Sequence, residues 1–361
     1  MKLHHVGIEV KDLYAVELFY RRALGFTLRY RYVSQNTPGL RTVFLERDGV
    51  QLELLERPRP DDFLARRAFA PDHVSLDVPD VDAEHARLAA LGWPGVTVGA
   101  PRNTGDGFRE LTLRDPEGNV IELSARVAPE PRYPVRAVLF DLDGTLIDSE
   151  ENYYLADKEL MARRGIEFTE RDKRKYIGGS NADMMVDLVR RYRLPDDPAA
   201  LGAEKNRLYL EIAEQRTRLY PEMKRFWDLV RRRGLPVAVA SGSAPHVLRR
   251  LLEVVGLARE VEVVVSAEEV ARGKPAPDVF LEAARRLGVP AHECAVVEDA
   301  RFGVEAARRA FMRCIAVPYL HEKPLDDAFH AADLLFEDGM ERFDALRALE
   351  WLDGQGSSLG A

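Results

Sequence analysis

Two carboxylates follow a short apolar run in the stretch VRAVLFDLDGTLIDS, at 135–149. Asp141 and Asp143 stand one residue apart, directly after the apolar residues. The run is typical of a buried strand, and ligands bind at the carboxyl ends of strands in open α/β sheets. Two acids at this spacing can share the work of a nucleophile and of an acid/base around a hard cation. A solvated acidic turn is the alternative interpretation of this motif alone.

Three later apolar runs lead to further residues that could take part in the same chemistry. Apolar runs alternate with helical patterns after residue 135, which predicts a parallel, doubly wound sheet whose strand ends share one edge. Taken singly, each polar residue has a structural explanation, such as a turn, an exposed loop or a helix cap. Their order after successive strands favours one assembled site. They are Ser241 and Gly242 after 237–240, Lys274 in the loop beyond 261–265, and Glu298 and Asp299 after 294–297.

The motifs DLDGT, ASGS, GKPAPD and VVEDA resemble those of the haloacid dehalogenase superfamily, in its phosphatase and phosphomutase branch, over residues 135 to about 320. The resemblance implies that Asp141 forms an aspartyl-phosphate. It implies that Asp143 protonates the leaving group and then activates water. Independently of the family, two carboxylates repel a phosphoryl dianion, so a cation and an ammonium group are needed beside them.

The resemblance also assigns ligands. Mg²⁺ would be held by the Asp141 carboxylate, the Asp143 backbone carbonyl and Asp299, with Glu298 oriented through water. Ser241, Gly242 and Lys274 would bind the phosphoryl oxygens.

An insertion at about 150–221 has helical periodicity and no strand signal, which is typical of a helical cap that excludes water from the site. It resembles the β-phosphoglucomutase-like subgroup at YIGGSNAD, which contains Gly178, Gly179 and Asn181, and at Lys205. The glycines would let the backbone approach a substrate, and Lys205 could meet a distal anionic group. A loop and a solvated helix face are the alternatives. Tyr153 and Asn181 stand where the mutases place a histidine and an arginine, which favours a phosphatase.

The first third of the chain contains an internal repeat. HVGIEVKDL at 5–13 aligns with HVSLDVPDV at 73–81, and DGVQLEL at 48–54 aligns with EGNVIEL at 117–123. The two copies keep their register across separate elements, which makes a chance match a poor explanation. Each copy predicts a strand, a helix and about three strands, with helices near 14–24 and 81–91.

Four residues that suit a metal occupy equivalent positions in the two copies. A single histidine of this kind would more often be a buried strand residue, but a pseudo-twofold would bring two histidines and two glutamates together. Imidazole and carboxylate groups suit a divalent transition metal. His4 and His85 do not share the pattern and are expected to be structural or solvated. The four candidate ligands are His5, Glu53, His73 and Glu122.

Residues 1–127 resemble the vicinal oxygen chelate fold of paired βαβββ modules, found in glyoxalase I and methylmalonyl-CoA epimerase. The resemblance implies Ni, Zn, Co or Mn on the four ligands. It implies that a ligand glutamate, Glu53 or Glu122, leaves the metal and acts as the proton-transfer base next to an enediolate. Extradiol dioxygenases use two histidines and one carboxylate, so four ligands argue against oxygen chemistry. Dimers of the family often share the metal, which makes a homodimer plausible.

Composition limits the remaining possibilities. The chain has 361 residues, 46% of them hydrophobic, and a net charge of −8 with acids and bases interspersed, which predicts two or three domains without a nucleic-acid footprint. Two cysteines without metal spacing indicate a reducing compartment, and no apolar stretch suits a membrane, so we expect a cytoplasmic protein. Three prolines at 124–136 indicate a linker. We expect domains at 1–127 and 135–350, a linker at 128–134 and a disordered tail at 351–361.

The sequence thus predicts an α+β domain of paired βαβββ modules followed by a doubly wound, Rossmann-like α/β domain with a helical cap. The functional prediction is a bifunctional enzyme. A Mg²⁺-dependent phosphatase for a small sugar or polyol phosphate is fused to a metal-dependent glyoxalase- or epimerase-like domain. Two alternatives stay open: a non-catalytic, ligand-binding or resistance-type amino-terminal domain, and sugar phosphomutase activity.

Overall fold

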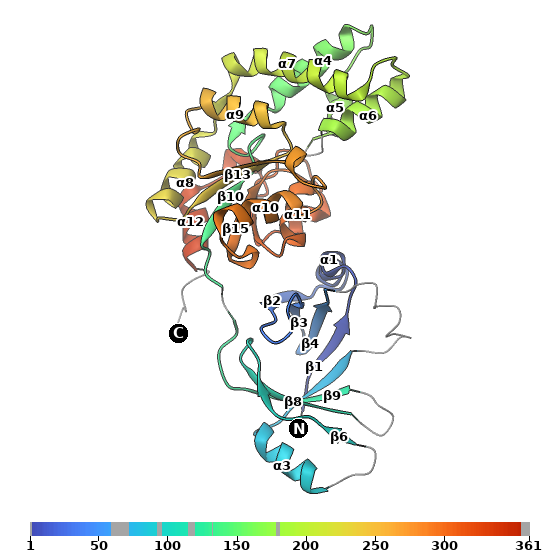
Figure 1. The fold of residues 1–361 in the computed structure, drawn as a ribbon, viewed down its shortest axis with the longest axis vertical. Helices are drawn as coiled ribbons and strands as arrows, with labels where there is room; N and C mark the ends of the chain where they lie inside the picture. The colour runs from blue at the N-terminus through green and yellow to red at the C-terminus, as the bar shows by residue number, and fades with distance from the viewer. Residues whose placement is uncertain are drawn as a thin grey trace. The chain divides into compact units, whose positions relative to one another are not determined.

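The computed structural model describes residues 2–58, 72–91, 96–114, 120–131, 133–177 and 181–354. The chain divides into two compact units, Met1–Arg132 and Tyr133–Ala361 (Figure 1). Within the described ranges, no helix is both long and apolar enough to cross a membrane.

The amino-terminal unit contains the repeated module that the sequence predicts. Each copy has a strand, a helix and further strands. The first copy comprises β1 (Lys2–Glu9), α1 (Leu13–Leu24), β2 (Thr27–Val33), β3 (Arg41–Arg47) and β4 (Val50–Glu56). The second comprises β5 (His73–Asp77), α3 (Val81–Leu91), β6 (Thr97–Val98), β7 (Arg102–Asn103), β8 (Phe108–Arg114) and β9 (Val120–Arg126).

Helix α1 begins and ends at residues that suit those positions. The Asp12 side chain accepts a hydrogen bond from the Ala15 backbone N–H and caps the first turn. Gly25 ends the helix with φ 69°, a left-handed conformation that glycine adopts without a steric penalty. The helix therefore lies within one residue of its predicted position.

The strands of both modules form one mixed sheet, in the order β2-β3-β4-β1-β5-β9-β8-β6, with β7 paired to β8. Strands β1 and β5 are antiparallel at its centre, and each pairs in parallel with the last strand of its own module. Gly7 lies opposite His73, and a Cβ atom on Gly7 would fall 2.3 Å from the His73 ring. Glycine at this position therefore makes room for the imidazole.

The second unit is built on a parallel sheet, as predicted. Its order is β14-β13-β10-β15-β16-β17. Alternate strand residues enter two separate apolar clusters, with Val138 and Phe140 on one face and Ala137 and Leu139 on the other. The sheet is therefore buried on both faces, as in a doubly wound fold. The strands are β10 (Ala137–Phe140), β13 (Val237–Ser241), β14 (Val263–Ser266), β15 (Cys294–Glu298), β16 (Arg313–Ala316) and β17 (Leu334–Leu335).

Helices cover this sheet, and four more form the cap. The covering helices are α8 (Pro221–Arg232), α9 (Pro245–Val254), α10 (Asp278–Leu287), α11 (Arg301–Arg309) and α12 (Ala345–Gly354). The cap helices, which gather at one end of the unit in Figure 1, are α4 (Glu150–Ala162), α5 (Glu170–Arg174), α6 (Asn181–Tyr192) and α7 (Pro198–Arg216).

Two expectations about this unit need correction. The insertion does contain a strand, because β12 (Arg218–Leu219) pairs with β11 (Ile147–Asp148), and this two-stranded ribbon joins the ends of the cap. Residues 351–354 belong to α12, where Leu352 is buried, and are not part of a disordered tail. Apolar residues in the last turn of α12 explain its extension. The rest of that tail, 355–361, lies outside the described residues.

Candidate active sites

Three carboxylates meet at the carboxyl ends of two neighbouring strands. Asp141 follows β10, while Glu298 ends β15 and Asp299 follows it; β10 and β15 are paired in parallel. One oxygen from each carboxylate lies within 4.8 Å of the others, and all three residues are buried. Gly144 makes the turn after Asp141 with φ 79°, and a Cβ atom there would fall 2.4 Å from Asp299 Oδ2. The backbone turn thus leaves just enough room for Asp299.

Lys274 supplies one positive charge to this acidic cluster. Its Nζ lies 2.6 Å from Asp141 Oδ1 and 2.5 Å from Glu298 Oε1. Burial opposes the charged form of this lysine, yet the two carboxylates raise its pKa. Burial raises the pKa of Asp141 to about 8, with Lys274 opposing the shift. Negative charge therefore exceeds positive charge in a buried site, and the oxygen donors fit a hard divalent cation such as Mg²⁺.

The Asp143 carboxylate does not join this cluster and is surrounded by hydroxyl groups. Oδ1 accepts hydrogen bonds from Ser149 at 2.8 Å and from Tyr209 at 3.2 Å. Oδ2 accepts from Ser243 at 2.8 Å, Ser241 at 3.3 Å and Tyr153 at 3.4 Å. Since Tyr153 and Tyr209 are on cap helices α4 and α7, cap and core both hold this side chain.

The remaining predicted residues of the carboxyl-terminal site that the structure describes line one small pocket of about 80 Å³. Ser241 and Gly242 stand at the end of β13 with Lys274 nearby, while Asn181 and Lys205 come from the cap. Gly178 and Gly179 lie outside the described residues. The pocket brings the core and cap motifs together around Asp141.

Sequence reasoning missed two charged cap residues beside Lys205. Lys205 Nζ lies 2.8 Å from Asp157 Oδ1, and Lys173 Nζ lies 3.0 Å from Asp157 Oδ2. The signal was an acid at a buried helical position: Asp157 lies between Ala156 and Leu160 on the apolar side of α4. A charge at such a position requires a partner.

In the amino-terminal unit, ligand-type atoms from both modules converge. His5 on β1, Glu53 on β4 and His73 on β5 place one ligand atom each within 4.8 Å of one another, and all three are buried. His5 Nε2 and His73 Nε2 are 2.8 Å apart. Glu53 Oε2 lies 3.4 Å from His5 Nε2 and 3.2 Å from His73 Nε2. This donor set fits a divalent transition metal. One chain supplies all three residues, so the group needs no second subunit.

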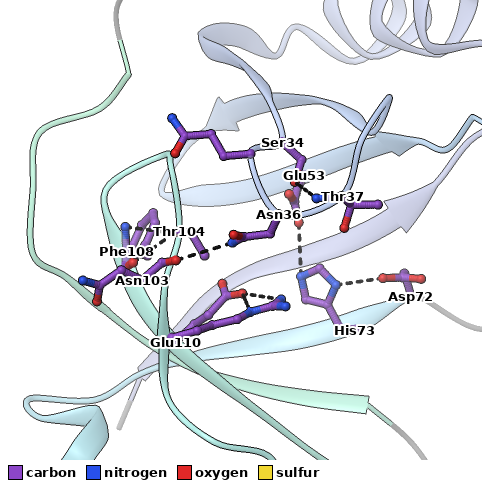
Figure 2. A network of polar contacts seen from close by, with 12 residues as sticks. Ser34, Asn36, Thr37, Glu53, Asp72, His73, Asn103, Thr104, Phe108 and Glu110 are labelled. Atoms are coloured by element: carbon purple, nitrogen blue, oxygen red, sulfur yellow. Dashed lines mark hydrogen bonds and ion pairs between the residues drawn. The ribbon is translucent and has the colours of Figure 1, made fainter.

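Outer contacts orient both imidazoles, and sequence reasoning missed them. His73 Nδ1 lies 3.1 Å from Asp72 Oδ2, and His73 lies between Asp72 and Glu53 in Figure 2. His4, at the equivalent position of the first copy, places Nδ1 2.7 Å from His5 Nδ1. Burial would lower the pKa of His73, but Asp72 and Glu53 raise it to about 11. A carboxylate behind a ligand histidine is a common device for fixing its ring.

The predicted fourth ligand, Glu122, does not join the group formed by the other three. Glu122 on β9 pairs with Ser75, just as Glu53 pairs with Gly7 in the other module. Ser75 Oγ is hydrogen-bonded to Ser124 Oγ at 2.9 Å, whereas Gly7, at the equivalent position of the first module, has no side chain. Burial raises the pKa of Glu122 well above its usual range. The two modules therefore differ at this position, and a group of two histidines and one carboxylate does not exclude oxygen chemistry.

A cavity of about 490 Å³ adjoins this group, lined by Glu53, His73 and Glu122. Its wall also carries arginines in ion pairs: Arg57 with Asp72, and Arg102 with Glu110. The cavity is large and polar enough for a small oxygen-rich metabolite.

Comparison with known proteins places both units in families. The haloacid dehalogenase-like hydrolase family matches residues 135–310, and the Glyoxalase/Bleomycin resistance protein/Dioxygenase superfamily matches residues 2–123. The chain is 32% identical over 202 residues to hexitol phosphatase B of Escherichia coli (strain K12), covering 55% of this chain and 90% of that protein. It is 30% identical to β-phosphoglucomutase of Bacillus subtilis (strain 168), covering 51% and 83% respectively.

A solved structure agrees with these matches. CbbY from Rhodobacter sphaeroides, in complex with xylulose-(1,5)bisphosphate, superposes with a TM-score of 0.53 at 26% identity, covering 57% of this chain and 95% of CbbY. A further relative, the chloroplastic Protein SUPPRESSOR OF QUENCHING 1 of Arabidopsis thaliana, is 36% identical over 210 residues, but the chain spans only 20% of its length. The chain therefore belongs to the haloacid dehalogenase-like hydrolase family, among β-phosphoglucomutase-like relatives, and carries a glyoxalase-superfamily domain before it.

Proposed function

We propose that the carboxyl-terminal unit is a Mg²⁺-dependent phosphatase for small sugar or polyol phosphates. The observation that carries the proposal is the buried Asp141, which forms an ion pair with Lys274 and lies beside Glu298 and Asp299 at the strand ends. Asp141, Asp299 and the Asp143 backbone would hold Mg²⁺, with Glu298 in support. The ion would neutralise charge on the phosphoryl oxygens as the transition state forms.

Asp141 and Asp143 would then have different roles in the reaction. An Asp141 carboxylate oxygen attacks phosphorus, the ester P–O bond breaks, and the leaving oxygen takes a proton from Asp143. In the second step Asp143 takes a proton from water, the water oxygen bonds to phosphorus and the P–O bond to Asp141 breaks, which releases inorganic phosphate and restores the Asp141 carboxylate. Lys274, Ser241 and the Gly242 backbone would bind the phosphoryl oxygens. A closed cap keeps other water away during the first step.

Hydrolysis is favoured over phosphomutase activity by two cap residues. Tyr153 and Asn181 occupy positions where the mutases carry a histidine and an arginine. Tyr153 donates to Asp143, and Asn181 Nδ2 donates to Asn206 Oδ1 at 3.3 Å. Neither residue supplies a fixed positive charge. A mutase needs such a charge to hold the second phosphate while the bisphosphate intermediate reorients in the site.

Release of inorganic phosphate tests the proposal. The full chain with Mg²⁺ is assayed against hexitol phosphates, hexose phosphates and phosphorylated carboxylic acids. We expect the hexitol and hexose phosphates to be hydrolysed fastest. Conversion of a hexose 1-phosphate to its 6-phosphate, after priming with a hexose bisphosphate, would show a mutase instead.

For the amino-terminal unit we propose a metal-dependent isomerase or epimerase that acts next to a carbonyl. His5, Glu53 and His73 would hold the metal, which when bound would supply Lewis-acid polarisation of the oxygens of a substrate in the adjoining cavity. Glu122, half-buried in the cavity wall and outside the ligand group, would move the proton at the neighbouring carbon. The ligand-binding alternative predicts binding without turnover.

Deuterium exchange separates these possibilities. Hydroxyketone and 2-methyl-3-oxoacid-type substrates are incubated in D₂O with the full chain, loaded in turn with Ni²⁺, Zn²⁺, Co²⁺ or Mn²⁺. We expect exchange next to the carbonyl that a His5→Ala, Glu122→Ala double change removes. Binding with no exchange would support the ligand-binding role. Oxygen uptake with Fe²⁺ and a catechol would point to the two-histidine, one-carboxylate chemistry of dioxygenases.

A further inference from the structure

The cap holds a closed ion-pair cluster on its side of the small pocket. Lys173 comes from α5, Lys205 from α7 and Asp157 from α4. Each oxygen of the Asp157 carboxylate faces one ammonium group, at 2.8 Å for Lys205 and 3.0 Å for Lys173. Asp157 therefore forms ion pairs with both lysines.

All three members are buried, with 0% of Asp157, 2% of Lys205 and 7% of Lys173 exposed. Both lysines line the pocket, whereas Asp157 lies behind them, outside the lining. Two ammonium groups so close together and so poorly hydrated need a counter-charge. Burial lowers the pKa of Lys205 to about 8, against the effect of Asp157. Asp157 thus compensates cations that would otherwise present their full charge to the pocket.

A second carboxylate reduces the positive charge further. Glu150, at the start of α4, is buried, lines the same pocket and interacts electrostatically with both lysines. Two carboxylates therefore stand against two ammonium groups. Because its charges nearly balance, such a cluster attracts a second phosphate dianion only weakly. This attraction would not offset the free energy that removing the dianion from water costs.

Unpaired acceptors complete this side of the pocket. Within the part of the chain that the structure describes, Glu150 Oε2 and Asn181 Oδ1 have no hydrogen-bond partner. Buried acceptors of this kind are costly unless a donor reaches them. A sugar or polyol hydroxyl can donate, whereas a phosphate dianion can only accept.

We propose that Asp157, by pairing with Lys173 and Lys205, makes the cap select phosphate monoesters with a neutral, hydroxyl-bearing distal end and reject a second phosphate. The inference rests on the proposed phosphatase function of the same pocket. It assigns Asp157 a specificity role without contact to the reacting atoms.

The test compares kcat/KM for glucitol 6-phosphate and glucitol 1,6-bisphosphate. The unmodified chain should prefer the monophosphate by at least about tenfold, as expected where a buried charge finds no partner. Asp157→Asn leaves Glu150 as the remaining carboxylate against two ammonium groups, and it should shift this ratio by about tenfold or more towards the bisphosphate. Glu159→Gln is the matched control: this exposed acid on the same helix pairs with Arg163, and its loss should leave the ratio unchanged.

Hydrolysis of acetyl phosphate, which has no distal end, reports whether each variant is folded and chemically competent. If Asp157→Asn does not fold, Lys173→Met serves instead, because it leaves the carboxylates in excess and should move the ratio further towards the monophosphate. Equal use of both substrates by the unmodified chain, or an unchanged ratio in a folded variant, would overturn the inference. Failure of the unmodified chain to hydrolyse any of these phosphates, acetyl phosphate included, would instead overturn the proposed phosphatase.

Discussion

The two candidate sites differ in where the fold places them. In the amino-terminal unit, the ligands project from within strands: His5 lies inside β1 and Glu53 inside β4. In the carboxyl-terminal unit, Asp141 and Asp299 stand just beyond strand ends. A strand buried on both faces has no free face for chemistry, whereas a mixed sheet lined by a cavity does. The architecture of each unit therefore decides which positions can be functional.

The sites also differ in donor chemistry and enclosure. Two imidazoles and a carboxylate adjoin a cavity of about 490 Å³ in the first, and three carboxylates with Lys274 line a pocket of about 80 Å³ in the second. Nitrogen donors favour transition metals, and an all-oxygen set favours Mg²⁺. Because the two sites use different donor atoms, we predict that a substitution can disable either site without affecting the other.

Among the three changes that probe the difference between the two sites, Asp143→Asn should have the largest effect. Without the acid, the leaving group departs unprotonated, so kcat for phosphate release should fall by about 10² to 10⁴. The amino-terminal site should still bind its metal. Asp148→Asn, at an exposed acid nearby, is the control and should retain activity. A fall below tenfold with sugar phosphates would remove Asp143 from the proton-transfer role.

Removing a ligand imidazole should disable the amino-terminal site and leave the carboxyl-terminal site active. His73→Ala deletes one of three ligand atoms, so affinity for Zn²⁺ or Ni²⁺ should fall by more than about 100-fold, beyond the effect of losing an outer contact. Phosphate release with Mg²⁺ should be unchanged. Isothermal titration calorimetry with each metal measures the affinity. Loss of phosphate release in this variant would mean that the two sites are not separable.

A smaller effect should follow Asp72→Asn. This change keeps every ligand but weakens the contact that fixes the His73 ring, so metal affinity should fall by about 10- to 100-fold. Glu84→Gln, an acid on α3 that pairs with Arg87, is the control. An affinity equal to that of the unmodified chain would show that Asp72 does not orient the ligand.

Local patterns predicted much of the fold and parts of both sites. The alternation of apolar runs and helical segments identified the parallel sheet, and the repeat identified the paired modules. The order of Asp141, Lys274 and Asp299 after successive strands was enough to expect them at one edge, because parallel strand ends converge there. His5, Glu53 and His73 followed from equivalence between the two copies.

Contacts between distant segments were beyond the reach of these patterns. Nothing local to Lys173 shows that it shares Asp157 with Lys205, because the three residues come from different helices. The difference between Gly7 and Ser75 was visible in the sequence, but the place of Glu122 outside the ligand group depends on how the strands pack. Such effects are decided by packing between elements, which periodicity does not encode.

Phosphate release by Asp141→Asn tests the central claim most directly. The amide cannot attack phosphorus as the carboxylate does, while the neighbouring Lys274 and Asp299 stay in place. With glucitol 6-phosphate and Mg²⁺, the account predicts phosphate release at the uncatalysed rate from a variant that still folds. Release at a rate close to that of the unmodified chain would contradict it.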